Sequence, residues 1–126
     1  MVPKLRNVDQ MSIQKIGEKL KSTSQLCREL KIDKKEFFGG SMTISSLGGI
    51  GGTHFTPIIN PPEVAILGVG RTFDRLVKEK NQIVSKKILP ISLSYDHRLI
   101  DGAEGARFCV YLGKCLGKDF AFKLAV

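Results

Sequence analysis

The side chains best suited to acid–base chemistry lie in one short segment, Tyr95 to Gly102, which carries His97 and, four positions later, Asp101. An imidazole exchanges protons near neutral pH, so a histidine held rigidly beside a reacting group can act as a general base. The pattern alone also allows a plainer interpretation. In that interpretation His97 is a satisfied, partly buried side chain, Asp101 only caps a helix, and Arg98 only pairs with a nearby carboxylate.

Two serines, Ser45 and Ser46, stand just before a glycine-rich stretch. A hydroxyl fixed there could donate a hydrogen bond to an oxyanion, or it could only satisfy nearby backbone groups. The glycines of 48–52 and 68–70 faintly suggest phosphate-binding loops, but neither run completes a dinucleotide fingerprint or a Walker sequence. We expect these glycines to serve backbone geometry, and His54 to be a packing or surface residue.

The cysteines and histidines do not form a pattern typical of a metal or disulfide site. Cys27, Cys109 and Cys115 are an odd set without Cys-x-x-Cys spacing, and His54 and His97 are the only histidines. These spacings favour neither a disulfide framework nor a zinc site. We expect three reduced thiols and no metal.

The composition is that of one soluble globular domain: 126 residues, 42% hydrophobic and 25% charged. The net charge of +8 would attract polyanions. However, the basic residues are dispersed without interleaved aromatic residues or a recognition helix, so no nucleic-acid partner is expected. No apolar run approaches the roughly 18 to 20 residues that a membrane span needs, and the first twenty residues lack a signal-peptide core, so we expect no membrane association.

The first half of the sequence predicts a helix, a strand and a long loop. Residues 12–30 carry an apolar stripe at helical spacing, expected to be buried: Ile13, Ile16, Leu20, Cys27 and Leu30. Ser41–Ser46 alternates polar and apolar residues, as in a strand. Leu47–Pro62 is rich in glycine and proline and predicts a functional loop, with Phe55, Ile58 and Ile59 indicating ordered packing.

The second half predicts the elements that position His97. Val64–Val69 is apolar throughout, as in a strand buried on both faces, and Ile88–Tyr95 reads as a second strand that delivers His97 at its end. Arg71–Lys87 is charged and is left unassigned. A helix follows from Gly102 to near Gly117, with Asp101 and Glu104 at the positions of a capping box. Its expected buried stripe is Ala106, Cys109, Val110, Leu112, Gly113 and Leu116.

The segment Asp96–Gly102 resembles the His-x-x-x-Asp-Gly signature of the dihydrolipoamide acyltransferase core of the 2-oxo-acid dehydrogenase complexes. The blocks Gly39–Gly40, Thr43–Gly48 and Phe55–Gly68 are similar to other characteristic blocks of that family, in the same order. The resemblance covers the chain from Val2 to about Leu116.

The resemblance implies an α/β fold of the α+β two-layer kind, the chloramphenicol acetyltransferase-like acyltransferase fold, with a mixed sheet packed by helices. The family's catalytic domain is about twice as long as this chain. Residues 1–126 are therefore expected to be the carboxy-terminal part of one acyltransferase catalytic domain, without lipoyl or peripheral-subunit-binding domains.

The resemblance also implies roles for the candidate residues. In the family a histidine takes the proton from a thiol of coenzyme A or dihydrolipoamide, and the thiolate attacks the acyl thioester of the other. His97 corresponds to this base. Asp101 corresponds to an acid that maintains the site around the histidine, although some members have asparagine there. Ser45 corresponds to the oxyanion donor, with Ser46 as the alternative.

The implied function is therefore acetyl transfer between dihydrolipoamide and coenzyme A, since the Ser45–Gly48 block is most similar to the pyruvate-type enzymes. Coenzyme A is expected as a substrate, and the lipoyl group is expected on a separate domain. The alternative is a catalytically incomplete structural or oligomerisation fragment of the same core.

The family forms trimers with active sites at subunit interfaces, and the trimers assemble into larger cores. The resemblance thus implies that His97 and Ser45 meet from different subunits, and that the tail Phe120–Val126 corresponds to a segment through which trimers contact one another. Lipoyl domains and the dehydrogenase components are the other expected partners. The expected location is the bacterial cytoplasm or, for a eukaryotic protein, the mitochondrial matrix.

Overall fold

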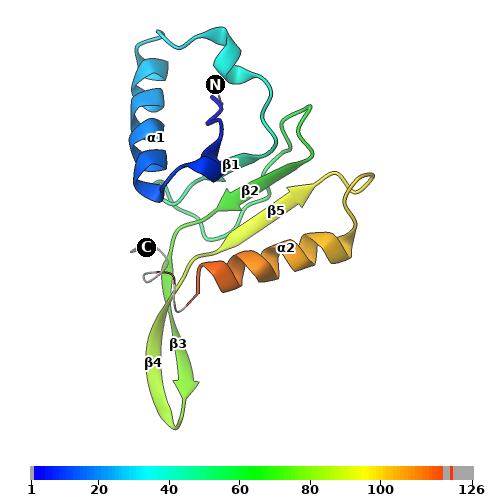
Figure 1. The fold of residues 1–126 in the computed structure, drawn as a ribbon. Helices are drawn as coiled ribbons and strands as arrows, with labels where there is room; N and C mark the ends of the chain where they lie inside the picture. The colour runs from blue at the N-terminus through cyan, green and yellow to red at the C-terminus, as the bar shows by residue number, and fades with distance from the viewer. Residues whose placement is uncertain (1, 118–119, 121–126) are drawn as a thin grey trace. The chain divides into compact units, whose positions relative to one another are not determined.

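A computed structural model describes residues 2–117 and 120 (Figure 1). The chain divides into two compact units, one formed by residues up to 41 together with those from 112 onward, the other by residues 42–111. Each unit is described by itself below. Most of the predicted tail Phe120–Val126 lies outside the described residues.

The first unit contains helix α1, Ile13–Arg28, and two short 3-10 helices, η1 at Val8–Gln10 and η2 at Lys34–Phe37. The Ser12 hydroxyl accepts a hydrogen bond from the backbone N–H of Lys15, as an N-cap should. The prediction of a helix here is confirmed. The helix ends at Arg28, two residues before the predicted end. Leu30 has a left-handed φ of 56°, through which a right-handed helix cannot continue.

The buried stripe predicted for this helix is wrong in part. Ile16 and Cys27 are half-buried, but Ile13, Leu20 and Leu30 are exposed, and no described residue of α1 is fully buried. Helical periodicity predicts which residues share a face. It does not guarantee that enough apolar surface lies opposite to cover that face, and within this small unit only part of the stripe is covered.

The second unit is built on a mixed three-stranded sheet of β1, Thr43–Ser46, β2, Ala65–Val69, and β5, Ile91–Tyr95 (Figure 1). The order is β1-β2-β5, with β1 parallel to β2 and β2 antiparallel to β5. The central strand β2 is buried almost throughout, as its continuous apolar sequence predicts. The mixed sheet of the predicted α+β fold is confirmed.

The polar side of β1 is the buried side. Thr43 is buried and Ile44 is 67% exposed, and the Thr43 hydroxyl donates a hydrogen bond to the buried carboxylate of Glu63. A buried polar group is tolerated only with such a partner. This pair attaches the start of β1 to the loop that leads into β2.

The single strand predicted over Ile88–Tyr95 is wrong in extent. The chain makes two strands there, β4, Gln82–Ile88, and β5, and neither includes Leu89 or Pro90. Proline has no N–H to give to a ladder, so a strand that reaches it ends or changes partner. Before the break, β4 pairs with the strand that precedes it in the chain, β3, Phe73–Glu79.

Strand β3, Phe73–Glu79, and β4 form an antiparallel hairpin within the segment that the sequence left unassigned. Figure 1 shows this hairpin extending away from the three-stranded sheet. The two residues at its tip, Lys80 and Asn81, both have positive φ, which is the geometry that two-residue hairpin loops favour. Its residues are mostly exposed.

Helix α2, Gly102–Cys115, follows the turn after β5. It ends slightly before the predicted Gly117, and its predicted buried stripe is shifted. Gly105 is the buried residue, and Cys109, Leu112 and Cys115 are half-buried, whereas Ala106, Val110, Gly113 and Leu116 are exposed. A Cβ on Gly105 would lie 2.8 Å from the Tyr95 ring, so the missing side chain allows the ring of β5 to pack against the helix.

The loop 47–62 contains neither helix nor strand, as predicted. Phe55 packs beneath β2, where a Cβ on Gly68 would lie 2.9 Å from its ring. Ile58, predicted to contribute to ordered packing, is instead 89% exposed. The three cysteines are free and half-buried. Within residues 2–117 and 120, no helix is long and apolar enough to cross a membrane, and no cluster of metal-binding side chains occurs.

Candidate active site

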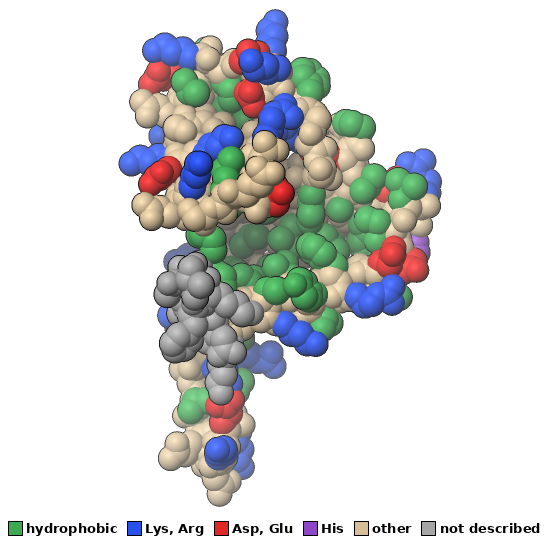
Figure 2. All heavy atoms as spheres, in the orientation of Figure 1, with side chains coloured by type: hydrophobic (Ala, Val, Ile, Leu, Met, Phe, Trp, Pro, Cys, Tyr) green, Lys and Arg blue, Asp and Glu red, His purple; other side chains and the backbone are tan. Residues whose placement is uncertain are grey.

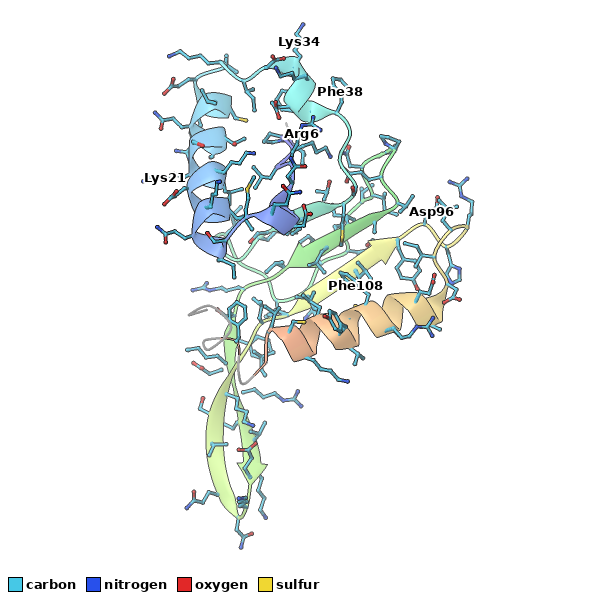
Figure 3. All side chains as sticks on the ribbon, viewed as in Figure 1. Arg6, Lys21, Lys34, Phe38, Asp96 and Phe108 are labelled. Carbon is cyan, nitrogen blue, oxygen red and sulfur yellow. The ribbon has the colours of Figure 1, made fainter. Side chains whose placement is uncertain are left out.

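His97 lies in a tight turn that leaves the end of β5 and leads into α2. Figure 3 labels its neighbour Asp96, which lies just after β5. The backbone N–H of Asp96 donates to the Val64 carbonyl at 2.8 Å, which attaches the turn to the residue before β2. The Asp96 carbonyl accepts from the N–H groups of Leu99 and Ile100, both at 3.0 Å. The backbone on each side of His97 is therefore fixed.

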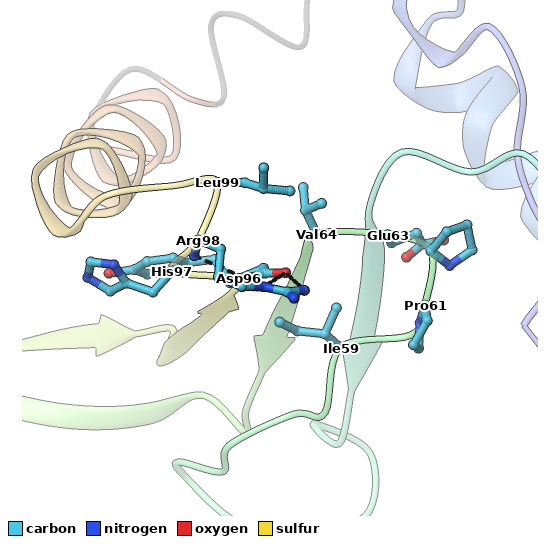
Figure 4. A pocket seen from close by; sticks show the side chains of 10 residues that line it. Ile59, Pro61, Glu63, Val64, Asp96, His97, Arg98 and Leu99 are labelled. Carbon is cyan, nitrogen blue, oxygen red and sulfur yellow. Dashed lines mark hydrogen bonds and ion pairs between the residues drawn. The ribbon is translucent and has the colours of Figure 1, made fainter.

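The side chains of Asp96 and Arg98 form a bidentate ion pair within this turn (Figure 4). Arg98 Nε lies 2.9 Å from Asp96 Oδ1, and Arg98 Nη2 lies 2.6 Å from Asp96 Oδ2. The guanidinium hydrogen bonds, helped by the backbone N–H of Arg98, lower the pKa of Asp96 to about 2. The carboxylate raises the pKa of Arg98 in turn. The nearby carboxylate that the plainer interpretation required for Arg98 is thus Asp96.

The His97 ring is exposed and lies beside Tyr95, with ring centroids 5.7 Å apart and a tilt of 38°. Gly102 lies close to both, since a Cβ there would be 3.9 Å from the Tyr95 hydroxyl and 4.0 Å from His97 Nε2. An open hollow of about 550 Å³ adjoins the turn and is lined by residues from the segments 59–64 and 95–99. His97 therefore borders a space that could admit a ligand.

Asp101 is the N-cap of α2, as predicted. Its Oδ1 accepts a hydrogen bond from the backbone N–H of Glu104 at 2.7 Å. The cap lies at the start of the helix that follows the His97 turn, next to Gly102.

Ser45 does not meet His97 within one chain. In the sheet register Ser45 pairs with Gly68, and Gly68 pairs with Ser92, which lies three residues before the end of β5. Two strand spacings and three residues of rise place Ser45 on the order of 14 Å from Tyr95, beyond the reach of a shared hydrogen bond with His97. Ser46 lies one residue farther along, so it does not meet His97 either.

The chain matches the family model described as 2-oxoacid dehydrogenases acyltransferase (catalytic domain) over residues 1–121. The chain belongs to this family. A Cupriavidus necator protein named the dihydrolipoyllysine-residue acetyltransferase component of the pyruvate dehydrogenase complex is 45% identical over 120 residues, which are 95% of this chain and 22% of that protein. The protein of the same name from Haemophilus influenzae is 49% identical over 116 residues, 92% of this chain and 20% of that protein.

Solved structures of this acyltransferase family share the fold. One comes from crystallographic and enzymatic work on a serine, a histidine and an asparagine in the catalytic mechanism of Azotobacter vinelandii dihydrolipoamide acetyltransferase. It has a TM-score of 0.89 at 45% identity and covers 94% of this chain and 49% of that one. The cubic core of a pyruvate dehydrogenase multienzyme complex gives a TM-score of 0.89 at 44% identity, with the same coverage. This chain thus spans about a fifth of its curated relatives and about half of these solved chains.

Sequence reasoning named three side chains of this turn and helix start, His97, Arg98 and Asp101, but missed two contacts. It did not assign the contact of Tyr95 with Gly105, or the ties that Asp96 makes around His97. The contact of Tyr95 with Gly105 has no clear signal in the sequence, because its only trace is one glycine within a helical segment. The second had a local signal, because aspartate two residues before an N–H donor commonly forms a side-chain turn.

Proposed function

We propose that this chain contributes to acetyl transfer between dihydrolipoamide and coenzyme A, with His97 as the general base. The support is family membership together with the names of the relatives, which are acetyltransferase components of pyruvate dehydrogenase complexes. The alternative of a purely structural fragment is not favoured, because the matching family model describes a catalytic domain.

One observation carries the assignment of the residues. In the Azotobacter enzyme, the serine studied for its catalytic role precedes the histidine by fifty-two positions, and the asparagine follows it by four, by that protein's own residue numbers. Ser45, His97 and Asp101 have the same two spacings here. Ser46 does not, so the spacing supports Ser45 as the oxyanion donor and supports Asp101 as the counterpart of the asparagine.

In the proposed reaction the His97 imidazole takes the proton of the attacking thiol. The thiolate then adds to the carbonyl carbon of the acyl thioester, and the Ser45 hydroxyl donates a hydrogen bond to the resulting oxyanion. When the intermediate collapses, the carbon–sulfur bond of the old thioester breaks and the imidazolium returns its proton to the departing thiolate. Asp101 maintains the turn and helix start that hold the imidazole.

The separation of Ser45 from His97 has a consequence for assembly. Because one copy cannot bring both to the same carbonyl, we propose that Ser45 of one copy serves His97 of another. The solved relative in a cubic core supports self-association, as it shows such catalytic domains assembled into a multienzyme core. Lipoyl domains and dehydrogenase components remain proposed partners, and the compartment stays a prediction.

The test is coenzyme A-dependent acetyl transfer by the full-length protein carrying His97→Ala, with His54→Ala as a matched control. We expect His97→Ala to lower kcat by about 10²- to 10⁴-fold, the usual contribution of general acid–base catalysis, and His54→Ala to change it little. Turnover by His97→Ala equal to that of the unmodified protein would exclude His97 as the base.

A further inference from the structure

Asp96 is tied to the backbone on both sides of His97. Its own N–H reaches the Val64 carbonyl, and its carbonyl receives the N–H groups of Leu99 and Ile100. Its carboxylate adds a further tie, accepting the backbone N–H of Arg98 at 3.0 Å. His97 lies between Asp96 and all three of these N–H donors, Arg98, Leu99 and Ile100. Its backbone position is thus set by Asp96.

The guanidinium of Arg98 completes the arrangement by occupying both carboxylate oxygens. Bidentate arginine–carboxylate pairs are among the more directional side-chain interactions. In Figure 4 the Asp96 carboxylate and the His97 ring point to opposite sides of the turn. Without Arg98 the carboxylate could rotate and accept a hydrogen bond from the protonated imidazole, and it would then compete with the departing thiolate for that proton.

We infer that Asp96, held by Arg98, is a positioning residue for His97: it fixes the turn and keeps its own carboxylate turned away from the imidazole. The inference rests on the proposed function, because it concerns how the proposed base is aimed. A misplacement of about 1 Å can cost on the order of 100-fold in rate, so positioning of this kind has a measurable effect.

A merely structural role would make different predictions from a positioning role. If Asp96 only stabilised the fold, its variants would lose activity in proportion to lost assembled protein. If it positions His97, kcat falls in the assembled protein while the KM for coenzyme A stays the same, since both oxygens of the Asp96 carboxylate are already occupied by Arg98. Asparagine should also restore much of the function, because its side-chain oxygen can still accept the Arg98 N–H.

The experiment uses the full-length protein in its assembled form with the variants Asp96→Ala, Asp96→Asn and Arg98→Ala. Asp74→Ala is the matched control, because it removes an aspartate–cation pair, with Lys87, on the β3–β4 hairpin. For Asp96→Ala we expect kcat to fall roughly 10- to 100-fold with the KM for coenzyme A within about twofold of the starting value. Asp96→Asn should lie within about threefold of the unmodified kcat, and Asp74→Ala should match it.

Amide hydrogen exchange of the same variants provides a readout that needs no catalysis. We expect the amides of Arg98, Leu99 and Ile100 to exchange faster in Asp96→Ala and near the unmodified rate in Asp96→Asn. Unchanged kcat in Asp96→Ala, an equal loss in Asp74→Ala, or unchanged exchange in the turn would each overturn the inference.

One outcome separates this inference from the proposed function, and a second variant covers the case in which Asp96→Ala does not assemble. If the unmodified protein shows no acetyl transfer, the proposed function fails, and the exchange rates alone decide whether Asp96 fixes the turn. If Asp96→Ala does not assemble, Arg98→Ala decides instead, since the Arg98 side chain is 88% exposed and its removal should leave the fold intact. A kcat for Arg98→Ala equal to that of the unmodified protein would then overturn the inference.

Discussion

Two aspartates of the second unit pair with cations, and the comparison between them shows how position decides what a charge can do. Asp96 lies in the turn after β5, makes a bidentate pair with Arg98 and also accepts a backbone N–H. Asp74 lies on the β3–β4 hairpin and makes a single contact with Lys87 at 3.0 Å, between side chains that are 60% and 79% exposed. The first pair is part of the backbone framework around His97, and the second lies on a solvated ribbon.

The wider regions differ in the same way. In the turn region, residues 94–105, side chains, caps and a close glycine contact all fix the same few residues. In the hairpin, Phe73–Ile88, the ladder is regular but most side chains are exposed, including Leu76 at 71% and Ile83 at 74%. We therefore expect substitutions to have large effects in the turn region and small ones in the hairpin.

The largest effect on stability should come from the contact between Gly105 and Tyr95. Alanine at Gly105 would place a methyl group 2.8 Å from the Tyr95 ring, which must shift or strain the junction of β5 and α2. Gly113 is the matched control in the same helix, since a Cβ there would meet no other described atom within 4 Å. We expect Gly105→Ala to be less stable than Gly113→Ala by about 1–3 kcal/mol, measured by urea unfolding.

Gly113→Ala should itself stabilise the protein by up to about 1 kcal/mol, because alanine favours a helix over glycine. If both variants gained the same stability, the Tyr95 contact would impose no constraint. Substitutions in the turn region would then affect stability less than its close contacts indicate, and the region would resemble the hairpin in this respect.

A smaller effect is expected from removing the cap of α2. Asp101→Ala deletes the acceptor for the Glu104 N–H and should cost about 1 kcal/mol in the free energy of unfolding. Asp101→Asn keeps an acceptor and should recover most of that loss. A loss equally large in both variants would point to the charge of Asp101 rather than to its hydrogen bond.

The sequence predicted the parts of this site that depend on neighbouring residues. A strand that ends at Tyr95, a histidine just beyond it and a capping aspartate before a helix are all local patterns, and the structure contains each of them. The partner of Arg98, Asp96, is also only two residues away, but the sequence predicted no more than a nearby carboxylate.

What the sequence did not predict depends on contacts between distant residues. The buried face of α2 is set by Tyr95 packing on Gly105, and the buried face of β1 is set by Thr43 bonding to Glu63. Neither contact can be read from the spacing of apolar residues within α2 or β1. The hairpin was missed for a related reason: its charged residues follow no clear period, and pairing across the tip at Lys80 and Asn81 defines it instead.

Acid should distinguish the turn from the rest of the unit. The pKa of Asp96 in the folded protein is lowered to about 2, below the value of about 3.9 of an unfolded aspartate. The unfolded chain therefore binds the proton more readily, and the stability from this pair is complete above about pH 4 and is lost as the pH falls toward 2. Asp96→Asn should flatten the dependence of the urea midpoint on pH in that window. Above pH 5 the urea midpoints of the unmodified protein and of Asp96→Asn should depend on pH in the same way. An equal slope for both proteins below pH 4 would contradict the assignment of this pKa to Asp96.

The smallest effect should come from the ion pair of the hairpin. Lys87→Ala removes its contact with Asp74, but both side chains are mostly exposed, so water and salt screen the attraction. We expect a loss of about 0.5 kcal/mol or less in the free energy of unfolding, reduced further in 0.5 M salt. A loss above roughly 1 kcal/mol that persists in salt would show that the hairpin is held by this pair. The exposed pair at Asp74 would then contribute to stability much as a pair within the turn does. The difference between the two aspartates could no longer be explained by where they lie in the fold.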